Sequence, residues 1–293
     1  MQLQTWDSFG QPTTSFNIYF AHMIKSKIIA DSIAPNGKRI TTFELEYPRF
    51  IHGEFMTHRA LSRNAASSRA IPACAMIKSV WSNPAEPVHW GMNQSGMQAE
   101  TELNGFNLWA AKKLWALSGK AACAFAALLN KVGAHKQIVN RIVEPWSHIK
   151  VVATATEWDN FFALRNHPDA QPEIHQLALL MYADYVDSTP QLLKKGEWHL
   201  PYVTEKSGVC TTADAIKLSA SLCAQVSYRK SDMSLSKALL IYDRLIDSKP
   251  CHASPFEHQA SPSFKKTDRS GNFTGWIQYR QQIAGNVCSS YKS

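Results

Sequence analysis

The residues best suited to chemistry lie between Phe50 and Pro72, in the segment FIHGEFMTHRALSRNAASSRAIP. This segment combines three arginines, two histidines and one glutamate with apolar residues at helical spacing. That spacing predicts an amphipathic helix from Phe50 to Leu61, with Glu54 and His58 one turn apart on one face. The small, hydroxyl-bearing residues that follow would let backbone N–H groups and a guanidinium converge on an anion. An exposed basic helix followed by a loop is the alternative interpretation.

Two strands predicted before this segment would place it against a sheet. Residues 27–33 and 39–47 are rich in β-branched and aromatic residues and flank a Pro-Asn-Gly turn, which predicts a hairpin. After the segment, residues 73–104 are rich in Pro, Gly and Asn and are predicted to form a long loop. Apolar periodicity and cap residues predict a strand at 151–156, a helix beginning at Ser254, and helices at 106–132, 135–143, 157–164, 169–186, 211–227 and 234–246.

The composition indicates a globular protein with an anionic partner. With 293 residues, 45% of them hydrophobic, the chain can bury a sizeable core. The net charge of +8 favours a polyanionic partner, and because the sequence has no run of five basic residues, a phosphorylated small molecule is favoured over nucleic acid. Six cysteines without paired spacing, the lack of a signal peptide and the lack of an apolar stretch of membrane length predict a cytoplasmic protein with no membrane partner.

Several common catalytic centres are disfavoured by the sequence. It contains no G-x-S-x-G elbow, Walker loop or G-x-G-x-x-G motif, and its histidines lack metal-ligand spacing, so no metal is predicted. Two arginines remain in apolar settings: Arg141 near a helix end, and Arg165 after a Phe-Phe-Ala-Leu run. A buried arginine needs an anionic partner, which is either a phosphorylated ligand or an internal carboxylate such as Glu144, Glu157 or Asp169.

Together these features resemble one family, the flavin-dependent thymidylate synthases (ThyX). The signature of that family reads Arg-His-Arg-x-x-Ser-x-Asn-x-x-Ser-x-Arg. The chain reads Thr57-His58-Arg59-Ala-Leu-Ser62-Arg-Asn64-Ala-Ala-Ser67-Ser-Arg69, so only the first position differs. Two further blocks resemble the family: Arg141-Ile-Val-x-Pro145, and Asn160-Phe-Phe-Ala-Leu-Arg165 with Ala170-Gln-Pro-Glu-Ile174.

A fourth block resembles the family's amino-terminal segment but occurs near the carboxyl end. It reads Cys251-His252-x-Ser254-Pro255-Phe256-Glu257-His258 and is preceded by Gln225-Val-Ser227-Tyr. The resemblance therefore implies a circularly permuted ThyX-like fold of the α/β (α+β) class, with a mostly antiparallel sheet flanked by helices. We expect a single domain over residues 1–293, with an extension at 1–22 and a tail at 266–293 that closes the site.

The resemblance also implies an activity. The family transfers a one-carbon unit from methylenetetrahydrofolate to C5 of dUMP, which gives dTMP, with FAD as cofactor and NADPH as reductant. Its members are homotetramers that hold FAD between subunits. By resemblance, this chain is a thymidylate synthase-like methyltransferase whose substrate is a pyrimidine deoxynucleoside monophosphate.

Residue roles are implied by the resemblance, position by position. Contacts with FAD are implied for His58, Arg59, Asn160, Ser227, His252, Ser254 and Glu257. Contacts with the substrate are implied for Glu54, Ser67, Ser68, Arg69, Arg141 and Arg165. Arg165 matches the arginine that favours the ionised N3 of uracil, so it is the predicted catalytic residue. A fixed cation in a dry site stabilises such an anion.

Departures from the family pattern leave alternatives open. In the signature region, Thr57 stands where the family has arginine, Ala65 where it has glutamate, Ser68 where it has glycine and Glu54 where it has glutamine. In the strand at 151–156, Thr154 and Thr156 stand where family members often have asparagine and arginine. Because an ionised carboxylate only accepts hydrogen bonds, Glu54 raises the hypothesis of dCMP as substrate or of a hydroxymethylated base as product. The other two hypotheses are a basic nucleic-acid-binding protein without catalysis and a flavin oxidase without folate chemistry.

Overall fold

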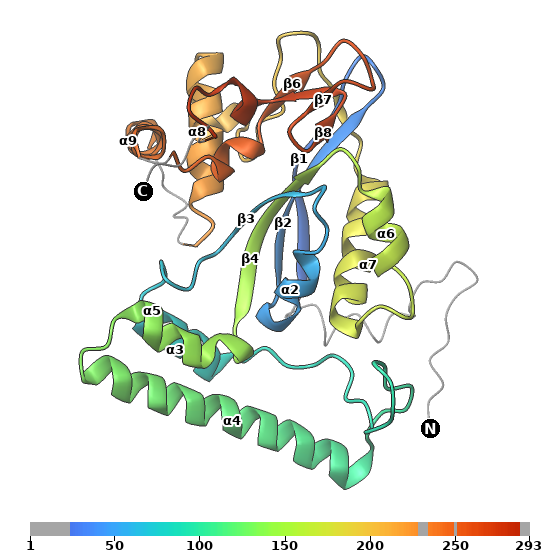
Figure 1. Cartoon of the computed structure of the whole chain (residues 1–293), viewed down its shortest axis with the longest axis vertical. Helices are drawn as coiled ribbons and strands as arrows, with labels where there is room; N and C mark the ends of the chain where they lie inside the picture. The colour runs from blue at the N-terminus through green and yellow to red at the C-terminus, as the bar shows by residue number, and fades with distance from the viewer. Residues whose placement is uncertain (1–23, 228–233, 249–250, 288–293) are drawn as a thin grey trace.

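The structure is a computed structural model of the whole chain, and it describes residues 24–227, 234–248 and 251–287. The predicted extension at 1–22 and the end of the predicted tail, 288–293, lie outside the described residues. In the described part, a central sheet has helices beside it, a helical layer at one end and a carboxyl-terminal block at the other (Figure 1). This arrangement confirms the predicted mixed α/β class.

The central sheet is mostly antiparallel. Within the described residues, its strands lie in the order β3-β4-β2-β1-β5. They are β1 (Lys25–Ile33), β2 (Arg39–Pro48), β3 (Ser62–Ala65), β4 (His148–Ala155) and β5 (Gln191–Leu192). Among these described pairings only β1 and β5 run parallel. β1 and β2 form the predicted hairpin, and β4 confirms the strand predicted at 151–156.

One face of the sheet forms the main core. Alternate residues of β2, Phe43, Leu45 and Tyr47, are fully buried in a cluster with residues of α2 (His52–Phe55), α6 (Asp159–Arg165) and α7 (Pro172–Asp187). Such period-two alternation is what a strand with one buried face requires. The Tyr47 and Phe55 rings lie 5.4 Å apart between centroids, so α2 is packed directly on the sheet.

A layer of helices lies at one end of the sheet. It contains α3 (Ala73–Ser82), α4 (Gly105–Lys131) and α5 (Lys136–Val143), whose buried residues form a cluster of their own. The prediction of a loop throughout 73–104 is therefore wrong at its start. Met76 and Val80 of α3 are buried against α4 and α5, and this tertiary packing stabilises a helix that the sequence did not indicate.

The carboxyl-terminal block contains α8 (Thr212–Ala224) and α9 (Leu235–Asp247), capped as predicted by the Thr211 and Ser234 hydroxyls. Short strands follow: β6 (Ala260–Pro262), β7 (Arg269–Ser270), β8 (Phe273–Thr274) and β9 (Trp276–Gln278). The remaining short helical turns are η1 (Arg49–Ile51), η2 (Glu144–Trp146), η3 (Glu205–Ser207), η4 (Ser254–Glu257) and η5 (Tyr279–Gln282). The helix predicted to begin at Ser254 is thus only the short turn η4.

The amphipathic helix predicted from Phe50 to Leu61 is also too long. Helical structure ends with α2 at Phe55, and the chain turns and enters β3 at Ser62. Arg63 Nη1 donates to the carbonyl oxygens of Met56 and His58, both at 3.0 Å, and to that of Phe55 at 3.3 Å. An arginine that satisfies these carbonyls replaces the hydrogen bonds that a continuing helix would have supplied.

A chain of buried polar groups joins the carboxyl-terminal block to the sheet. His258 Nδ1 lies 2.8 Å from Thr154 Oγ1, whose hydroxyl lies 2.7 Å from that of Thr42. Thr42 Oγ1 lies 2.8 Å from His199 Nε2, and His199 Nδ1 lies 2.9 Å from Ser32 Oγ. Burial lowers the pKa of both histidines to about 3, so both are neutral at pH 7.

These two histidines should make the fold sensitive to acid. Their folded-state pKa values lie below the unfolded value of 6.5, so the stability they provide is present above pH 6.5 and falls as the pH drops toward 3. We expect a loss of about 1.4 kcal/mol per pH unit for each histidine below pH 6. Urea unfolding at pH 7.5, 6 and 5 measures this loss. A free energy of unfolding that stays flat over this pH range would contradict it.

Candidate active site

Arg165, the last residue of α6, is the centre of a first group of predicted site residues. Its Nε donates to His58 Nε2 at 2.8 Å, and its Nη2 lies 3.4 Å from Thr57 Oγ1. Its Nη1 forms an ion pair with Glu54, and the two side chains are 19% and 26% exposed. An internal carboxylate therefore does pair with Arg165, but it is Glu54 and not one of those suggested from the sequence. We call Glu54, Thr57, His58 and Arg165 the Arg165 cluster.

His58 is kept neutral by its surroundings. Burial lowers its pKa to about 4, with further contributions from the positive charges of Arg165 and Arg63. Because the Nε–H of Arg165 donates to Nε2, the proton of the neutral ring belongs on Nδ1. The ring also packs edge-on against Phe161, with centroids 4.9 Å apart. The Arg165 cluster thus holds a fixed, uncharged imidazole beside a fixed cation.

A cavity of about 220 Å³ opens beside the Arg165 cluster. Its walls come from residues 57–61 and from the α6 region, including Asn160 and Phe161. Four predicted site residues share it: His58, Arg59, Asn160 and Arg165. Aromatic and imidazole rings together with two guanidinium groups suit a flat ligand that carries negative charge.

A second group of predicted residues lies on the stretch that leaves β3. In Ser67–Arg69, Ser68 is buried and its carbonyl oxygen accepts from Asn140 Nδ2 at 2.7 Å, while the Arg69 side chain is exposed. The neighbouring Arg141 on α5 is 61% exposed and forms a 3.1 Å ion pair with Glu144. The prediction that Arg141 is buried is therefore wrong, and the alternative of an internal pair is confirmed.

A third group lies on or near η4. Glu257 forms an ion pair with Arg280, and the side chains of His252 and Ser254 are exposed. Ser227 meets the second group, because its Oγ accepts from the backbone N–H of Ser67 at 2.9 Å.

The first and second groups lie on different sides of β4. In Figure 1, α2 and α6 lie on one side of this strand, whereas β3 and the stretch after it descend on the other side toward α5. One chain therefore presents the Arg165 cluster and the Ser67–Arg69 stretch at separate places.

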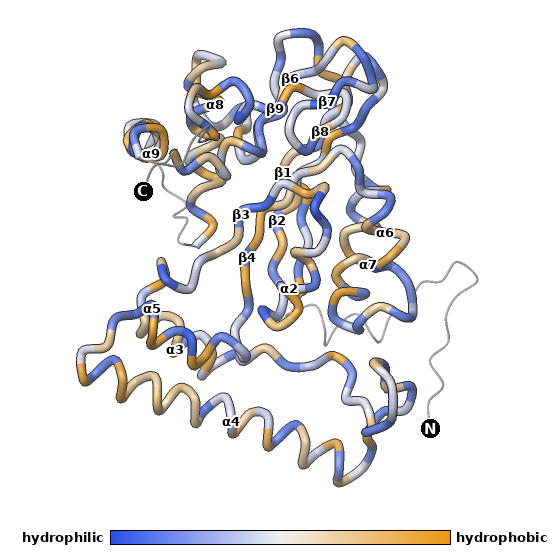
Figure 2. The backbone as a smooth tube through the Cα atoms, in the orientation of Figure 1, coloured by the Kyte–Doolittle hydropathy of each residue, from blue (hydrophilic) through white to orange (hydrophobic). Residues whose placement is uncertain are grey.

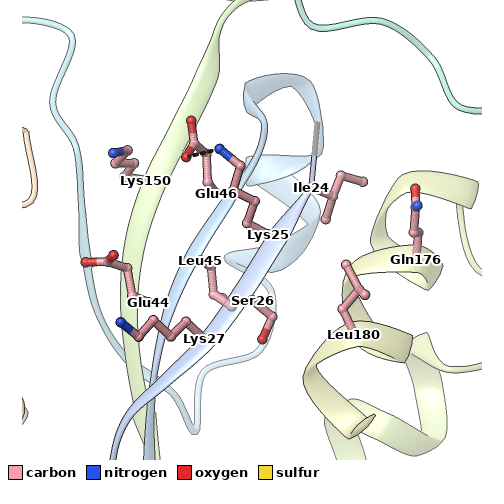
Figure 3. A pocket seen from close by; sticks show the side chains of 10 residues that line it. All are labelled: Ile24, Lys25, Ser26, Lys27, Glu44, Leu45, Glu46, Lys150, Gln176 and Leu180. Carbon is pink, nitrogen blue, oxygen red and sulfur yellow. Dashed lines mark hydrogen bonds and ion pairs between the residues drawn. The ribbon is translucent and has the colours of Figure 1, made fainter. Parts of the chain in front are cut away.

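A larger cavity, of about 440 Å³, is lined by residues of none of the three groups. Figure 3 shows it along β1 and β2, with Lys25, Lys27, Glu44 and Glu46 among the residues around it. None of the predicted site residues, all of which the structure describes, lines it. Lys25 pairs with Glu46 at 3.3 Å, and β5 pairs with β1 only at Ser32 and Ile33, so Lys25 and Lys27 lie on a part of β1 that β5 does not cover. Lysines on such an open edge commonly prevent unwanted strand pairing. We therefore assign it no chemistry.

The described residues contain no group of three or more His, Cys, Asp or Glu side chains arranged to hold a metal ion. Among the helices of this part of the chain, none combines the length and apolar character needed to cross a membrane.

Residues 39–191 match the sequence profile of a known family, described as thymidylate synthase complementing protein (Thy1). The matched region exceeds half of the 293 residues and includes the signature, Arg141 and Arg165. The chain belongs to this family. The resemblance predicted from the signature is confirmed, and the Thy1-family chain is a thymidylate synthase-like methylase.

Two solved structures similar to this Thy1-family chain are both of the UMP/dUMP methylase PolB from Streptomyces cacaoi, one bound with 5-Br UMP and the other with 5-Br dUMP. Their sequences are 16% and 14% identical to this chain, with TM-scores of 0.45 and 0.44. Each match covers 56% of this chain, and 88% and 90% of the respective solved chains. No curated protein sequence matches the chain.

Three residues that shape the site of this Thy1-family chain were missed from the sequence. Arg63, which ends α2, lies inside the signature, and its position four residues after Arg59 was the available signal. Gln278 Nε2 lies 3.1 Å from Ser62 Oγ, and Arg280 pairs with the Glu257 carboxylate. Both belong to the tail, outside every block that resembles the family, so no sequence signal indicated them.

Proposed function

We propose that this Thy1-family chain transfers a one-carbon unit from methylenetetrahydrofolate to C5 of a pyrimidine deoxynucleoside monophosphate, with FAD as cofactor and NADPH as reductant. The first candidate substrate is dUMP, which would give dTMP. The observation that carries the proposal is the Arg165 cluster, in which a partly buried guanidinium is held by a carboxylate and a neutral imidazole beside a cavity.

Arg165 would act on the base of the nucleotide. Because its guanidinium is already fixed by protein acceptors, it needs no reorganisation when negative charge builds up on a bound pyrimidine. Stabilising that charge raises the electron density at C5, where the new carbon–carbon bond forms. His58 holds the guanidinium as a neutral acceptor and so adds no competing positive charge.

The residues present fit part of FAD. The cavity of about 220 Å³ is smaller than the roughly 300–1,000 Å³ that enclose a drug-sized ligand. One chain would therefore hold one portion of the cofactor with His58, Arg59 and Asn160. The proposed contacts for other portions are Ser227, His252, Ser254 and Glu257. When bound, FAD would supply the reducing equivalents that turn the transferred carbon into a methyl group.

We also propose a homotetramer in which copies share each site. Five residues on the outward face of α4, with Val132 directly after the helix, form an apolar stripe, the α4 stripe, and each is at least 59% exposed: Phe106, Leu114, Leu117, Phe125, Leu128 and Val132. Figure 2 shows hydrophobic positions recurring along α4, which lies at the outer edge of the molecule. A second copy that covers this stripe would bury it, because monomers rarely expose large contiguous apolar patches. Sharing would let the Ser67–Arg69 stretch of one copy meet the Arg165 cluster of another.

A permuted chain order is part of the proposal. Asn64 Nδ2 donates to Cys223 O at 3.2 Å, so the block before Ser227 lies beside the signature strand β3. Asn36 Nδ2 donates to Ser263 O at 2.9 Å, so the chain just after η4 lies beside the start of β2. In the unpermuted order, the block that this chain carries near its carboxyl end would come first and run directly into β2, so it would occupy the same region. Both contacts therefore support a permuted order.

The absorption spectrum of the purified protein tests the proposal. We expect a flavin band at about 450 nm that shifts when the accepted nucleotide is added, because the base should stack near the flavin. Protein that stays colourless after FAD is added, and whose DNA affinity falls steeply with salt, would favour the nucleic-acid-binding alternative. NADPH consumption that no nucleotide affects would favour the flavin oxidase.

The ion pair between Glu54 and Arg165 favours a second candidate substrate, dCMP. It sets a carboxylate acceptor beside guanidinium donors, which complements the amino group and N3 of cytosine. If Glu54 contacts the base, Glu54→Gln should lower the ratio of dCMP to dUMP turnover by roughly tenfold, because the amide can also donate to O4 of uracil. Competition assays with both nucleotides and the same folate measure this ratio.

Glu157→Gln is the matched control, since Glu157 lines the cavity beside the Arg165 cluster but pairs with Lys38. It should leave the ratio unchanged. Exclusive turnover of dUMP by wild type and by Glu54→Gln would contradict the dCMP candidate and leave dUMP as the substrate. Analysis of the product by mass would separate a methylated base from a hydroxymethylated one.

A further inference from the structure

The tail after β6 forms a fixed wall beside the third group of predicted residues. β9 pairs with β6 along the register Ala260↔Gln278 to Pro262↔Trp276. Phe273 and Trp276 are fully buried, in a cluster that includes Ile40 of β2. Large aromatic side chains in a core do not leave it readily, so this part of the tail is integral to the fold. The described part of the tail, residues 266–287, is therefore a permanent part of the fold, and closure of the site by residues 266–293 stays a prediction.

Gln278 ties this wall to both the signature and η4. Its Nε2 lies 3.1 Å from Ser62 Oγ and 3.1 Å from the carbonyl oxygen of Glu257. Its backbone N–H donates to Ser270 Oγ at 3.0 Å, and its side chain is only 2% exposed. The backbone of Glu257 is therefore held at a fixed position relative to the signature strand.

Arg280 acts on the Glu257 side chain itself. Its Nη1 forms an ion pair with Oε1 of the carboxylate, and its Nη2 donates to Asn286 O at 3.2 Å. The Arg280 and Glu257 side chains are 28% and 16% exposed, so the pair is better shielded than one at an open surface. Without this guanidinium, the Glu257 carboxylate would be free to turn toward water. Arg280 thus favours one orientation of Glu257.

We propose that Arg280 is a positioning residue for cofactor binding: it orients Glu257 so that the carboxylate accepts hydrogen bonds from hydroxyl groups of FAD. The ion pair engages Oε1, so Oε2 is the oxygen that would accept from the ligand. The inference rests on the proposed function, in which Glu257 contacts FAD. It assigns the tail, which lies outside the matched family region, a part in building the site.

A double-mutant cycle tests the proposal through FAD affinity, measured by quenching of flavin fluorescence. Arg280→Ala should weaken FAD binding about tenfold, the usual scale for a charge-assisted hydrogen bond. Glu257→Ala should weaken it at least as much, and the double variant should bind no more weakly than Glu257→Ala alone, because Arg280 acts only through Glu257. Arg280→Lys should restore most of the affinity. Arg269→Ala, which removes an exposed charge from the same tail, is the matched control and should bind as wild type does.

Each other outcome has a distinct meaning. Losses that add in the double variant would overturn the proposal, since Arg280 would then contact FAD directly. An unchanged affinity with a lower melting temperature would also overturn it and leave a purely structural pair. If Arg280→Ala does not fold, Arg280→Gln takes its place in the cycle. Losses of FAD affinity that add in the double variant of Arg280→Gln and Glu257→Ala would refute the inference. Wild-type protein that binds no FAD would refute the proposed function before any variant is compared.

Discussion

Arg165→Ala is expected to lower kcat/KM for the pyrimidine nucleotide by roughly 10²–10³-fold, the usual cost of removing one preorganised electrostatic group. The guanidinium is the cation that would face a charge developing on the base, and it is already fixed by Glu54 and His58. Arg165→Lys should recover little, because an ammonium cannot donate to both partners in the planar geometry of a guanidinium. Steady-state formation of the methylated nucleotide, followed at saturating folate and NADPH, measures the effect.

The control for this prediction is Arg244→Ala, which removes an exposed positive charge from α9. It should keep wild-type turnover. Because Arg165→Ala leaves the partly buried Glu54 carboxylate unpaired, the melting temperature of the variant must be compared with that of wild type. A folded Arg165→Ala variant that turns over within threefold of wild type would show that charge stabilisation on the base comes from another group.

Leu117→Asp, in the middle of the α4 stripe, is expected to split the proposed tetramer and to lower turnover by at least about tenfold. The substitution would bury an unpaired carboxylate in an apolar interface, which costs roughly several kcal/mol for each copy of the chain. Turnover should fall together with assembly, because the Arg165 cluster and the Ser67–Arg69 stretch lie on different sides of β4 within one chain (Figure 1). Light scattering coupled to size exclusion gives the mass, and activity is measured on the same fractions.

Ala127→Asp is the matched control for assembly, since it adds the same charge at an exposed position of α4 outside the stripe. It should leave the mass unchanged. If the wild-type protein runs as a monomer with full activity, the shared site is wrong. If Leu117→Asp stays assembled, the tetramer uses a surface other than the α4 stripe.

Local sequence patterns were sufficient to predict many of the elements. The Pro-Asn-Gly turn and alternating apolar residues predicted the hairpin of β1 and β2, and the hydroxyls of Thr211 and Ser234 marked the start of two helices correctly. These signals act over a few residues, so they can be read without the fold. The patterns failed at α3, whose helix depends on burying Met76 and Val80 against α4 and α5.

The site was predictable in its residue types but only partly in its contacts. The signature residues indicated a family and a chemistry, and the profile match confirms the family. The sequence did not indicate that Glu54 would be the partner of Arg165, because 111 positions separate the two along the chain. It also placed Arg141 in a buried setting, whereas α5 turns that side chain outward to pair with Glu144.

By itself, the sequence determined the class of fold and the positions of most helices and strands, and it predicted a set of side chains to bind an anionic nucleotide. The tertiary structure decided which of those side chains meet. It ends α2 early through Arg63, joins His58 and Glu54 to Arg165, and packs the tail so that Arg280 reaches Glu257. Propensity and capping depend on neighbours within a turn or two. An ion pair between distant residues instead forms only where packing of the whole chain brings both charges together and shields them from water.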